Sequence, residues 1–375
     1  MAPAERGKMK RMERCVPAEK EKTSQRGRMM WADAARSFAI LCVVLCHTAE
    51  AGFGFDLAAM PQYSLKLQVL AFFLFTAGRL GVPVFLFLSG FLLMDREYPD
   101  AQSVVHFWKT HLCSLWCTTQ LWLVLYSCFD AVRPGGVPFS AARLARNMLF
   151  FEYSYGHMWY MPAILGVYLF LPFVARAVRG MNTRVMLVPF FVAVVYLFGM
   201  PTLNVLLVAQ GRPPLGNVMA LEFGGGTCDM LMMAGLLCRR GCFRALGHPL
   251  ALVPAAAAFG ATVWLQIYSY SKGQMYNVKY DCFLLAFCAL CVFQNIRRLR
   301  TIPFAGAIRR LSKCSFGIYL VHIPLQQLLE GCMRKIGFLP ARIAFHFLVP
   351  LAVSWALVYA VGKLPRVGRA LFYMK

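Results

Sequence analysis

Residues 31–50 read WADAARSFAILCVVLCHTAE, an apolar run of membrane-spanning length that nevertheless carries ionisable groups. A spanning helix needs about 20 mostly apolar residues. Asp33, Arg36 and His47 interrupt the run, and their spacing places all three on one face of a helix with 3.6 residues per turn. A charged group in hydrocarbon is costly, so such a face usually points into a helix bundle and has a function.

Apolar runs of this kind recur along the chain. Hydrophobic residues make up 59% and charged residues 15% of the 375 residues, against about 45–50% and about 25% in soluble domains. A single soluble domain and a disordered chain are therefore excluded. The sequence predicts an all-α, polytopic membrane helix bundle of about 10 transmembrane helices. The predicted spans are 31–51, 67–94, 112–130, 157–178, 185–208, 218–238, 249–270, 278–295, 313–333 and 342–363.

The net charge of +23 is distributed unevenly between the loops. With the N-terminus in the cytoplasm, the inner segments hold 27 Lys and Arg and the outer segments hold 10. This asymmetry follows the positive-inside rule and predicts that both termini are cytoplasmic. It argues against nucleic-acid binding, because the excess lies in short loops beside the spans. The basic loop 297–313 either grips phosphates or only sets topology.

Three parts of the chain follow from these patterns. We expect a flexible basic cytoplasmic tail at 1–29, a transmembrane domain at 30–363 and a short cytoplasmic tail at 364–375. Cys288 and Cys291 form a CxxC inside an apolar run without a neighbouring His, so we expect helix contacts there and no metal site.

The depth of residues in the first two spans can be compared at about 1.5 Å of rise per residue. Measured from the inner end, Arg79 lies roughly 22 Å up and His47 roughly 24 Å up, whereas Arg36 and Ser89 both lie roughly 8 Å up. If the two antiparallel spans are neighbours, Arg79 meets His47, and Arg36 meets the notch formed by Ser89 and Gly90.

Each of these residues also has a purely structural interpretation. Arg36 could snorkel to the inner interface with Asp33 as its partner. His47 could be a hydrogen-bonded interior histidine, although Glu50, one turn further on, suits a residue that orients a catalytic imidazole. Tyr319 and His322, one turn apart, could simply join two helices.

The fourth span begins with aromatic residues and a histidine at the outer interface. His157, Trp159 and Tyr160 follow further aromatic residues between 150 and 155. Membrane interfaces favour such aromatic belts. The alternative is a platform on which a sugar stacks.

Three motifs occur in order along the chain: Asp33-x-x-Arg36 followed by His47, Arg79-x-x-x-Pro83-x-Phe85-x-x-x-Ser89-Gly90, and Ser315-Phe-Gly-Ile-Tyr-Leu-Val-His322. In these motifs, and over roughly residues 30–363, the chain resembles the acyltransferase 3 family of integral membrane acyltransferases. His157-x-Trp159 with the later Tyr168 and Pro172 is similar to the subgroup that O-acetylates surface-glycan precursors in bacterial inner membranes.

The resemblance implies transfer of an acyl group, usually acetyl, from acyl-coenzyme A to a hydroxyl of a surface glycan or its lipid-linked precursor. Acyl-coenzyme A is then a co-substrate, and no cofactor or metal is permanently bound. The partners are the acyl donor, the glycan acceptor and the lipid bilayer. The implied residues are His47, Arg36 and Arg79 for catalysis; Asp33, Glu50, Ser89, Gly90, Tyr319 and His322 for donor binding or support; and His157, Trp159 and Tyr160 on the acceptor side. Val82 departs from the Arg-x-x-Arg of some members, which bears on the identity of the acceptor.

A transporter or flippase of a glycan intermediate is the alternative, because intramembrane Arg and His also suit a proton-coupled carrier. Transporters of this kind often carry internal repeats, and none is visible in the sequence. Labelled acetyl-coenzyme A separates the two functions, because only an enzyme transfers the label.

Overall fold

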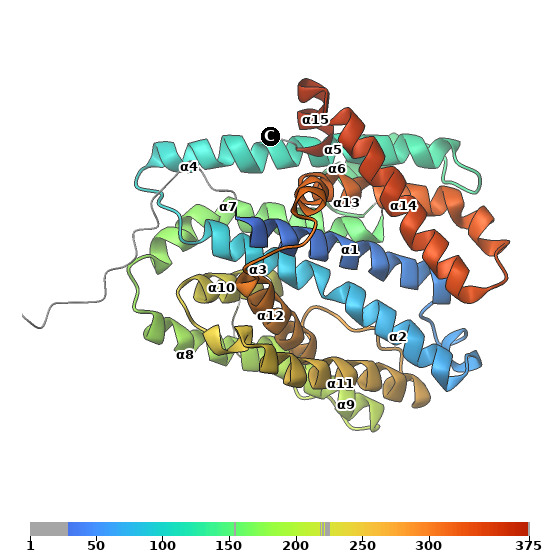
Figure 1. The fold of residues 1–375 in the computed structure, drawn as a ribbon, viewed down its shortest axis with the longest axis horizontal. Helices are drawn as coiled ribbons and strands as arrows, with labels where there is room; N and C mark the ends of the chain where they lie inside the picture. The colour runs from blue at the N-terminus through green and yellow to red at the C-terminus, as the bar shows by residue number, and fades with distance from the viewer. Residues whose placement is uncertain (1–28, 154, 218, 220, 222–225, 374–375) are drawn as a thin grey trace, which may run out of the picture.

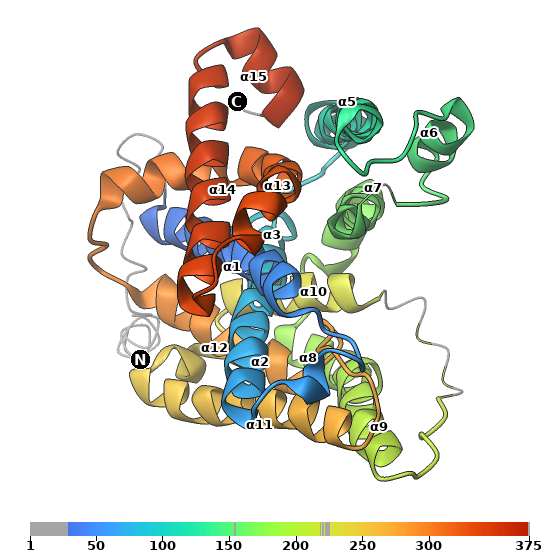
Figure 2. The same cartoon turned by 90° about the vertical axis from the view of Figure 1, so that its right-hand side faces the viewer.

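The computed structural model describes residues 29–153, 155–217, 219, 221 and 226–373. Within these residues the regular elements are all helices, and no strand occurs among them. Figures 1 and 2 show the helices packed into one bundle. The predicted all-α helix bundle is thereby confirmed. The expected tail at 1–29 lies outside the described residues, apart from Met29.

Helix α1 (Met30–Phe53) lies at the centre of the bundle (Figure 1). Alanines such as Ala35, Ala39 and Ala49 are fully buried on it. Small side chains let neighbouring helices approach closely, which is how helices associate within a membrane. The helices that pack against α1 are α2 (Leu65–Arg79), α3 (Gly81–Leu93), α12 (Phe283–Arg298), α13 (Ala305–Arg334) and α14 (Leu339–Val361).

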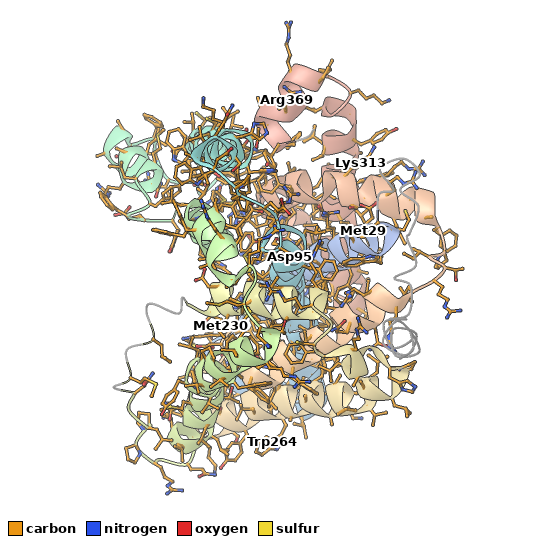
Figure 3. The ribbon with its side chains drawn as sticks, turned by 90° about the vertical axis from the view of Figure 1, so that its left-hand side faces the viewer. Met29, Asp95, Met230, Trp264, Lys313 and Arg369 are labelled. Atoms are coloured by element: carbon orange, nitrogen blue, oxygen red, sulfur yellow. The ribbon has the colours of Figure 1, made fainter. Side chains whose placement is uncertain are left out.

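Two further groups of helices flank this centre. One group contains α4 (Ala101–Phe107), α5 (Cys113–Val132), α6 (Ala141–Met148), α7 (Tyr160–Val178) and α15 (Pro365–Phe372). The other contains α8 (Thr183–Val194), α9 (Met200–Ala209), α10 (Thr227–Arg239) and α11 (Leu252–Ser271). Arg369 on α15 and Trp264 on α11 lie at opposite edges of the molecule in Figure 3.

The second apolar run is broken into two helices. The break falls between Gly78 and Pro83, at Leu80. Pro83 lies in the first turn of α3, where its missing backbone N–H breaks no helical hydrogen bond. The break lets Arg79 end α2 where that helix meets α1.

Seven helical segments are long and apolar enough to cross a membrane, against the ten spans expected. They are Met30–Phe53, Leu65–Leu93, Ala101–Val132, Gly156–Val178, Thr183–Ala209, Pro249–Ser271 and Leu339–Val361. The other three predicted spans also contain helices. However, α10 has 13 residues and α12 has 16, and polar residues such as Gln326 and Glu330 lower the hydropathy of the 30-residue α13. Part of the predicted span 218–238 lies outside the described residues.

The segment expected to be a short tail at 364–375 contains α15, which packs on α5, α13 and α14. Trp122 donates a hydrogen bond from Nε1 to the Leu371 carbonyl at 2.6 Å. Thr118 donates from its hydroxyl to the Ala370 carbonyl at 3.1 Å. Phe372 is buried, so this end of the chain belongs to the bundle.

Helices α3 and α10 touch backbone to backbone through two glycines. A Cβ atom on Gly90 would lie 1.9 Å from the Met232 carbonyl oxygen, and one on Gly235 would lie 2.1 Å from the Phe87 carbonyl oxygen. Any larger residue must push the helices apart. This contact holds α3 against α10.

We expect Gly90→Ala to lower the melting temperature of the purified protein, because an added methyl group in a packed contact costs about 1–3 kcal/mol. Gly166→Ala is the matched control, since nothing lies within 4 Å of a Cβ at that position. Equal melting temperatures for the two variants would contradict the packing argument.

Candidate functional site

A cavity of about 260 Å³ lies beside α1. Figure 2 shows α1, α3, α5, α7 and α13, which supply most of its walls. The lining residues are Arg36, Val43, Cys46, His47, Arg79, Val82, Phe85, Ser89, Leu115, His157, Trp159, Tyr160, Ile164, Tyr168, Tyr280, Ser315, Phe316, Tyr319 and Tyr373.

The cavity is long in the direction of α1. Arg36 and His47 both line it, and eleven residues of helix separate them by about 16 Å at a rise of 1.5 Å per residue. Ser89 of α3 lines the cavity with Arg36, and Arg79 of α2 lines it with His47. The estimated depths paired Arg36 with Ser89 and Arg79 with His47. The structure brings these four residues to one cavity.

His47 is held by a carboxylate of its own helix. Its Nδ1 lies 2.6 Å from Glu50 Oε2, three residues further along α1. A carboxylate only accepts hydrogen bonds, so Nδ1 carries a proton, and in the neutral imidazole Nε2 presents a lone pair. A nitrogen with a free lone pair is what a general base or a nucleophile needs.

Arg79 lies beside this pair. Its Nη2 atom is 3.9 Å from Glu50 Oε1. Its guanidinium lies 4.8 Å from the ring centroid of Phe75 and 4.9 Å from that of Tyr280. Nε of Arg79 is buried without a hydrogen-bond partner among the described residues. The Arg79 guanidinium therefore has an unused N–H donor at Nε. A cation in this position can stabilise negative charge that develops next to His47.

Three histidines from three elements gather at this end of the cavity. The ring of His47 lies 5.4 Å from that of His322 and 6.0 Å from that of His157, and the latter two rings are 5.6 Å apart. His157 lines the cavity, whereas His322, on α13, is fully buried and is not among the lining residues. Tyr319 lines the cavity and donates from its hydroxyl to the His157 carbonyl at 2.7 Å.

Aromatic rings form the wall next to these groups. Trp159 stacks on Tyr280 with ring centroids 5.3 Å apart, and Tyr160 lies against Trp159. Both the tryptophan and Tyr160 line the cavity. These residues therefore offer flat apolar faces with polar edges close to His47.

At the other end of the cavity, Arg36 lies next to a buried carboxylate. Asp33 is fully buried and accepts a hydrogen bond from the Ser312 hydroxyl at 2.7 Å. Arg36 Nη1 lies 3.5 Å from the same carboxylate and keeps about a third of its side chain exposed. Asp33 thus ties α1 to α13 and supports Arg36 at the cavity wall.

The structure does not place Gly90 at the cavity, where the depth comparison expected it beside Arg36. Neighbouring residues of a helix point about 100° apart. Ser89 faces the cavity, so Gly90 faces α10, where it makes the close contact with Met232.

Cys46 Sγ, a nitrogen of His47 and a carboxylate oxygen of Glu50 lie within 4.8 Å of one another, a spacing that could hold a metal ion. The direct hydrogen bond between His47 and Glu50 explains their placement without an ion.

The comparison with protein families gives one match. The family model described as an acyltransferase domain, of the acyltransferase 3 type, matches residues 30–360. The chain belongs to the acyltransferase 3 family. Neither the curated proteins nor the solved structures include a significant match. This protein is therefore an integral membrane acyltransferase that transfers groups other than amino-acyl groups.

Three tyrosines at or beside the cavity of this acyltransferase were not predicted from the sequence. Tyr280 lies in the connection before α12, in a stretch that hydropathy assigned to a span. Tyr126 is buried on α5 and lies 3.3 Å from His157. Tyr373 lines the cavity although it follows α15, beyond the family match. A tyrosine in an apolar chain carries no local signal of such a position, because long-range packing creates it.

We expect Glu50→Gln to slow acyl transfer by roughly 10²-fold, because an amide can leave His47 in the wrong tautomer, with its lone pair turned away from the substrate. Rates of transfer from a labelled acyl donor, measured on purified protein, test this. Glu330→Gln, at an exposed ion pair on α13, is the control. An unchanged rate in Glu50→Gln would show that the carboxylate does not orient the imidazole.

Proposed function

We propose that this acyltransferase is an O-acetyltransferase that moves an acetyl group from acetyl-coenzyme A to a sugar hydroxyl of a cell-surface glycan or its lipid-linked precursor. The observation that carries the proposal is the cavity along α1, with Arg36 at one end and the His47–Glu50 pair beside Arg79 at the other.

The donor would enter from the cytoplasmic side, past Arg36. The pantetheine arm of coenzyme A is long and thin, and the roughly 16 Å between Arg36 and His47 gives it room to reach the base. Arg36 would hold an amide or a phosphate of the donor through its planar set of N–H groups. Ser89 would supply a hydroxyl on the same wall.

At the far end, His47 would meet the thioester. A sugar hydroxyl is a poor nucleophile at neutral pH and needs help. Nε2 of His47 either takes the hydroxyl proton directly or attacks the thioester carbon and carries the acyl group. Arg79 would stabilise the oxyanion that forms on the carbonyl oxygen in either route.

The acceptor sugar would lie against Trp159, Tyr160 and Tyr280. Their rings line the cavity beside His47 and Arg79 and offer apolar faces on which a sugar ring can stack. The lipid bilayer itself would bring a lipid-linked precursor to this wall.

The membrane is then the cell inner membrane, with both termini in the cytoplasm. The distribution of Lys and Arg between loops supports this orientation. Reporter fusions after Lys375 test it, because an extracytoplasmic signal would contradict the cytoplasmic C-terminus.

Mass spectrometry of surface glycans from cells with and without the gene tests the proposed reaction. Acetyl groups that disappear with the gene would support it. Unchanged glycan acetylation, together with no transfer of label from acetyl-coenzyme A, would contradict it.

We expect His47→Ala to reduce acetyl transfer by about 10²–10⁴-fold, the usual effect of losing a general base. The variant should melt like the wild type, since the ring lies at a cavity wall. His106→Ala, at an exposed histidine on α4, serves as the control. Near-normal transfer by purified His47→Ala would make His47 a structural residue.

The two arginines should differ in kinetic effect. Arg36→Ala should raise the KM for acetyl-coenzyme A. The reason is that Arg36 would hold the donor equally strongly in the bound complex and in the transition state, so its loss weakens donor binding without slowing the chemical step. Arg79→Ala should lower kcat with a smaller change in KM, and Arg79→Lys should restore part of the rate if charge alone matters. Steady-state kinetics with matched melting curves measure both. An unchanged donor KM in a normally folded Arg36→Ala would contradict the donor role of Arg36.

A further inference from the structure

The hydrogen bonds of His157 determine which of its ring nitrogens carries the proton. The Tyr126 hydroxyl lies 2.7 Å from the Leu320 carbonyl oxygen and 3.3 Å from His157 Nε2. A carbonyl only accepts, so the single phenolic proton goes to Leu320. The contact with His157 is then a hydrogen bond only if Nε2 carries the proton and donates it to the phenolic oxygen. His157 is thus left with a bare lone pair on Nδ1.

That lone pair has no partner. Nδ1 of His157 is buried and makes no hydrogen bond among the described residues, although the residue lines the cavity. A buried polar atom without a partner destabilises the folded protein. The capacity of Nδ1 to accept a hydrogen bond is therefore unused among the described residues.

His322 shows the same pattern in a different place. Its Nδ1 lies 2.9 Å from the Ile318 carbonyl oxygen and must donate, so its Nε2 is a lone pair, also buried and unpartnered. Because His322 is not among the lining residues, a substrate meets His157 first. His47 and His157 are therefore the two imidazoles among the cavity-lining residues. In the neutral rings the free lone pair is on Nε2 of His47 and on Nδ1 of His157.

A second base is needed if His47 carries the acyl group. Once Nε2 of His47 is bonded to the acyl carbon, it has no lone pair left with which to take a proton. The acceptor hydroxyl must still lose its proton before it can attack efficiently. Among the cavity-lining residues, His157 is the other imidazole, with its ring centroid 6.0 Å from that of His47.

We propose that the acyl group passes through His47 and that His157 is the base that takes the proton of the acceptor hydroxyl. The proposal rests on the proposed acetyl-coenzyme A-dependent function and adds a second catalytic residue to it.

The acyl group is transferred in two steps. His47 Nε2 attacks the thioester carbon, the C–N bond forms, the C–S bond breaks, and coenzyme A leaves as a thiolate. In the second step the hydroxyl proton moves to His157 Nδ1, the acceptor oxygen bonds to the acyl carbon, and the C–N bond to His47 breaks. His157 then releases its proton to water, and the thiolate takes one up, so no net proton is gained or lost.

Tyr126 is a positioning residue in this scheme. It is fully buried on α5 and keeps the proton of His157 on Nε2, away from the acceptor.

The test measures two steps separately. Loading is the transfer of the acetyl group from acetyl-coenzyme A to the enzyme, and discharge is its transfer from the enzyme to the acceptor alcohol. Purified full-length protein is mixed with radiolabelled acetyl-coenzyme A without acceptor, and label on the protein is counted. Octyl glucoside is then added as the probe alcohol, and loss of label from the protein is followed. His157→Gln is the main variant, because its amide can still donate to Tyr126 but has no basic nitrogen.

We expect wild type and His157→Gln to load equally, and His157→Gln to discharge about 10²–10⁴-fold more slowly, as expected for a lost base. His346→Gln is the matched control. His346 is a buried histidine whose Nδ1 also lacks a partner, but it is not among the cavity-lining residues. Tyr126→Phe should also load normally and discharge slowly, whereas a purely structural defect would impair both steps and the melting temperature.

The outcomes are distinguishable. Normal discharge by His157→Gln, or equally slow discharge by His346→Gln, would overturn the role of His157. Transfer to the glucoside by a wild-type enzyme that never carries label would overturn the acyl-His47 step and leave the proposed function intact. No transfer and no loading by wild type would mean that the proposed function itself is wrong.

Discussion

The site depends on the contact between Gly78 and the backbone of α1. A Cβ atom on Gly78 would lie 2.4 Å from the Cys46 nitrogen, so only glycine permits this approach. The residues that follow these two in the sequence are Arg79 and His47. By bringing α2 and α1 together at one point, the contact places a guanidinium beside the carboxylate that holds the imidazole. The break after Arg79 then lets α3 continue along the rest of α1.

Inside the helix bundle, a buried polar atom depends on the protein for its hydrogen-bond partner. In the described residues many are paired across helices, such as the Asp33 carboxylate with Ser312 and the Gln266 amide with Thr76. Unpaired atoms are costly where water is absent. Several lie elsewhere in the bundle, but three belong to Arg79, His157 and His322, around the end of the cavity near His47. Three hydrogen-bonding atoms that the described residues leave unused therefore surround this end of the cavity.

The two ends of the cavity, which are separated along α1, contain different groups. Arg36, supported by Asp33, is a cation at one end, about three helical turns from His47. Arg79 and the His47–Glu50 pair lie at the other end, beside aromatic walls. Separation of this kind would let the donor and the acceptor enter a membrane enzyme from different sides while reacting at one place.

The sequence alone determined the all-helical class, the shared face of Arg36 and His47, and the depth at which Arg79 and Ser89 sit, because helix rise and periodicity are local properties. The motifs also identified the family that the match over residues 30–360 shows. The sequence could not determine which of Ser89 and Gly90 faces the cavity, how the predicted span 278–295 shortens to leave Tyr280 in a connection, or that Tyr126 and Tyr373 approach from α5 and α15. Only the tertiary structure decided these, because they depend on how helices distant in sequence rotate and pack against one another, and hydropathy carries no information about that rotation.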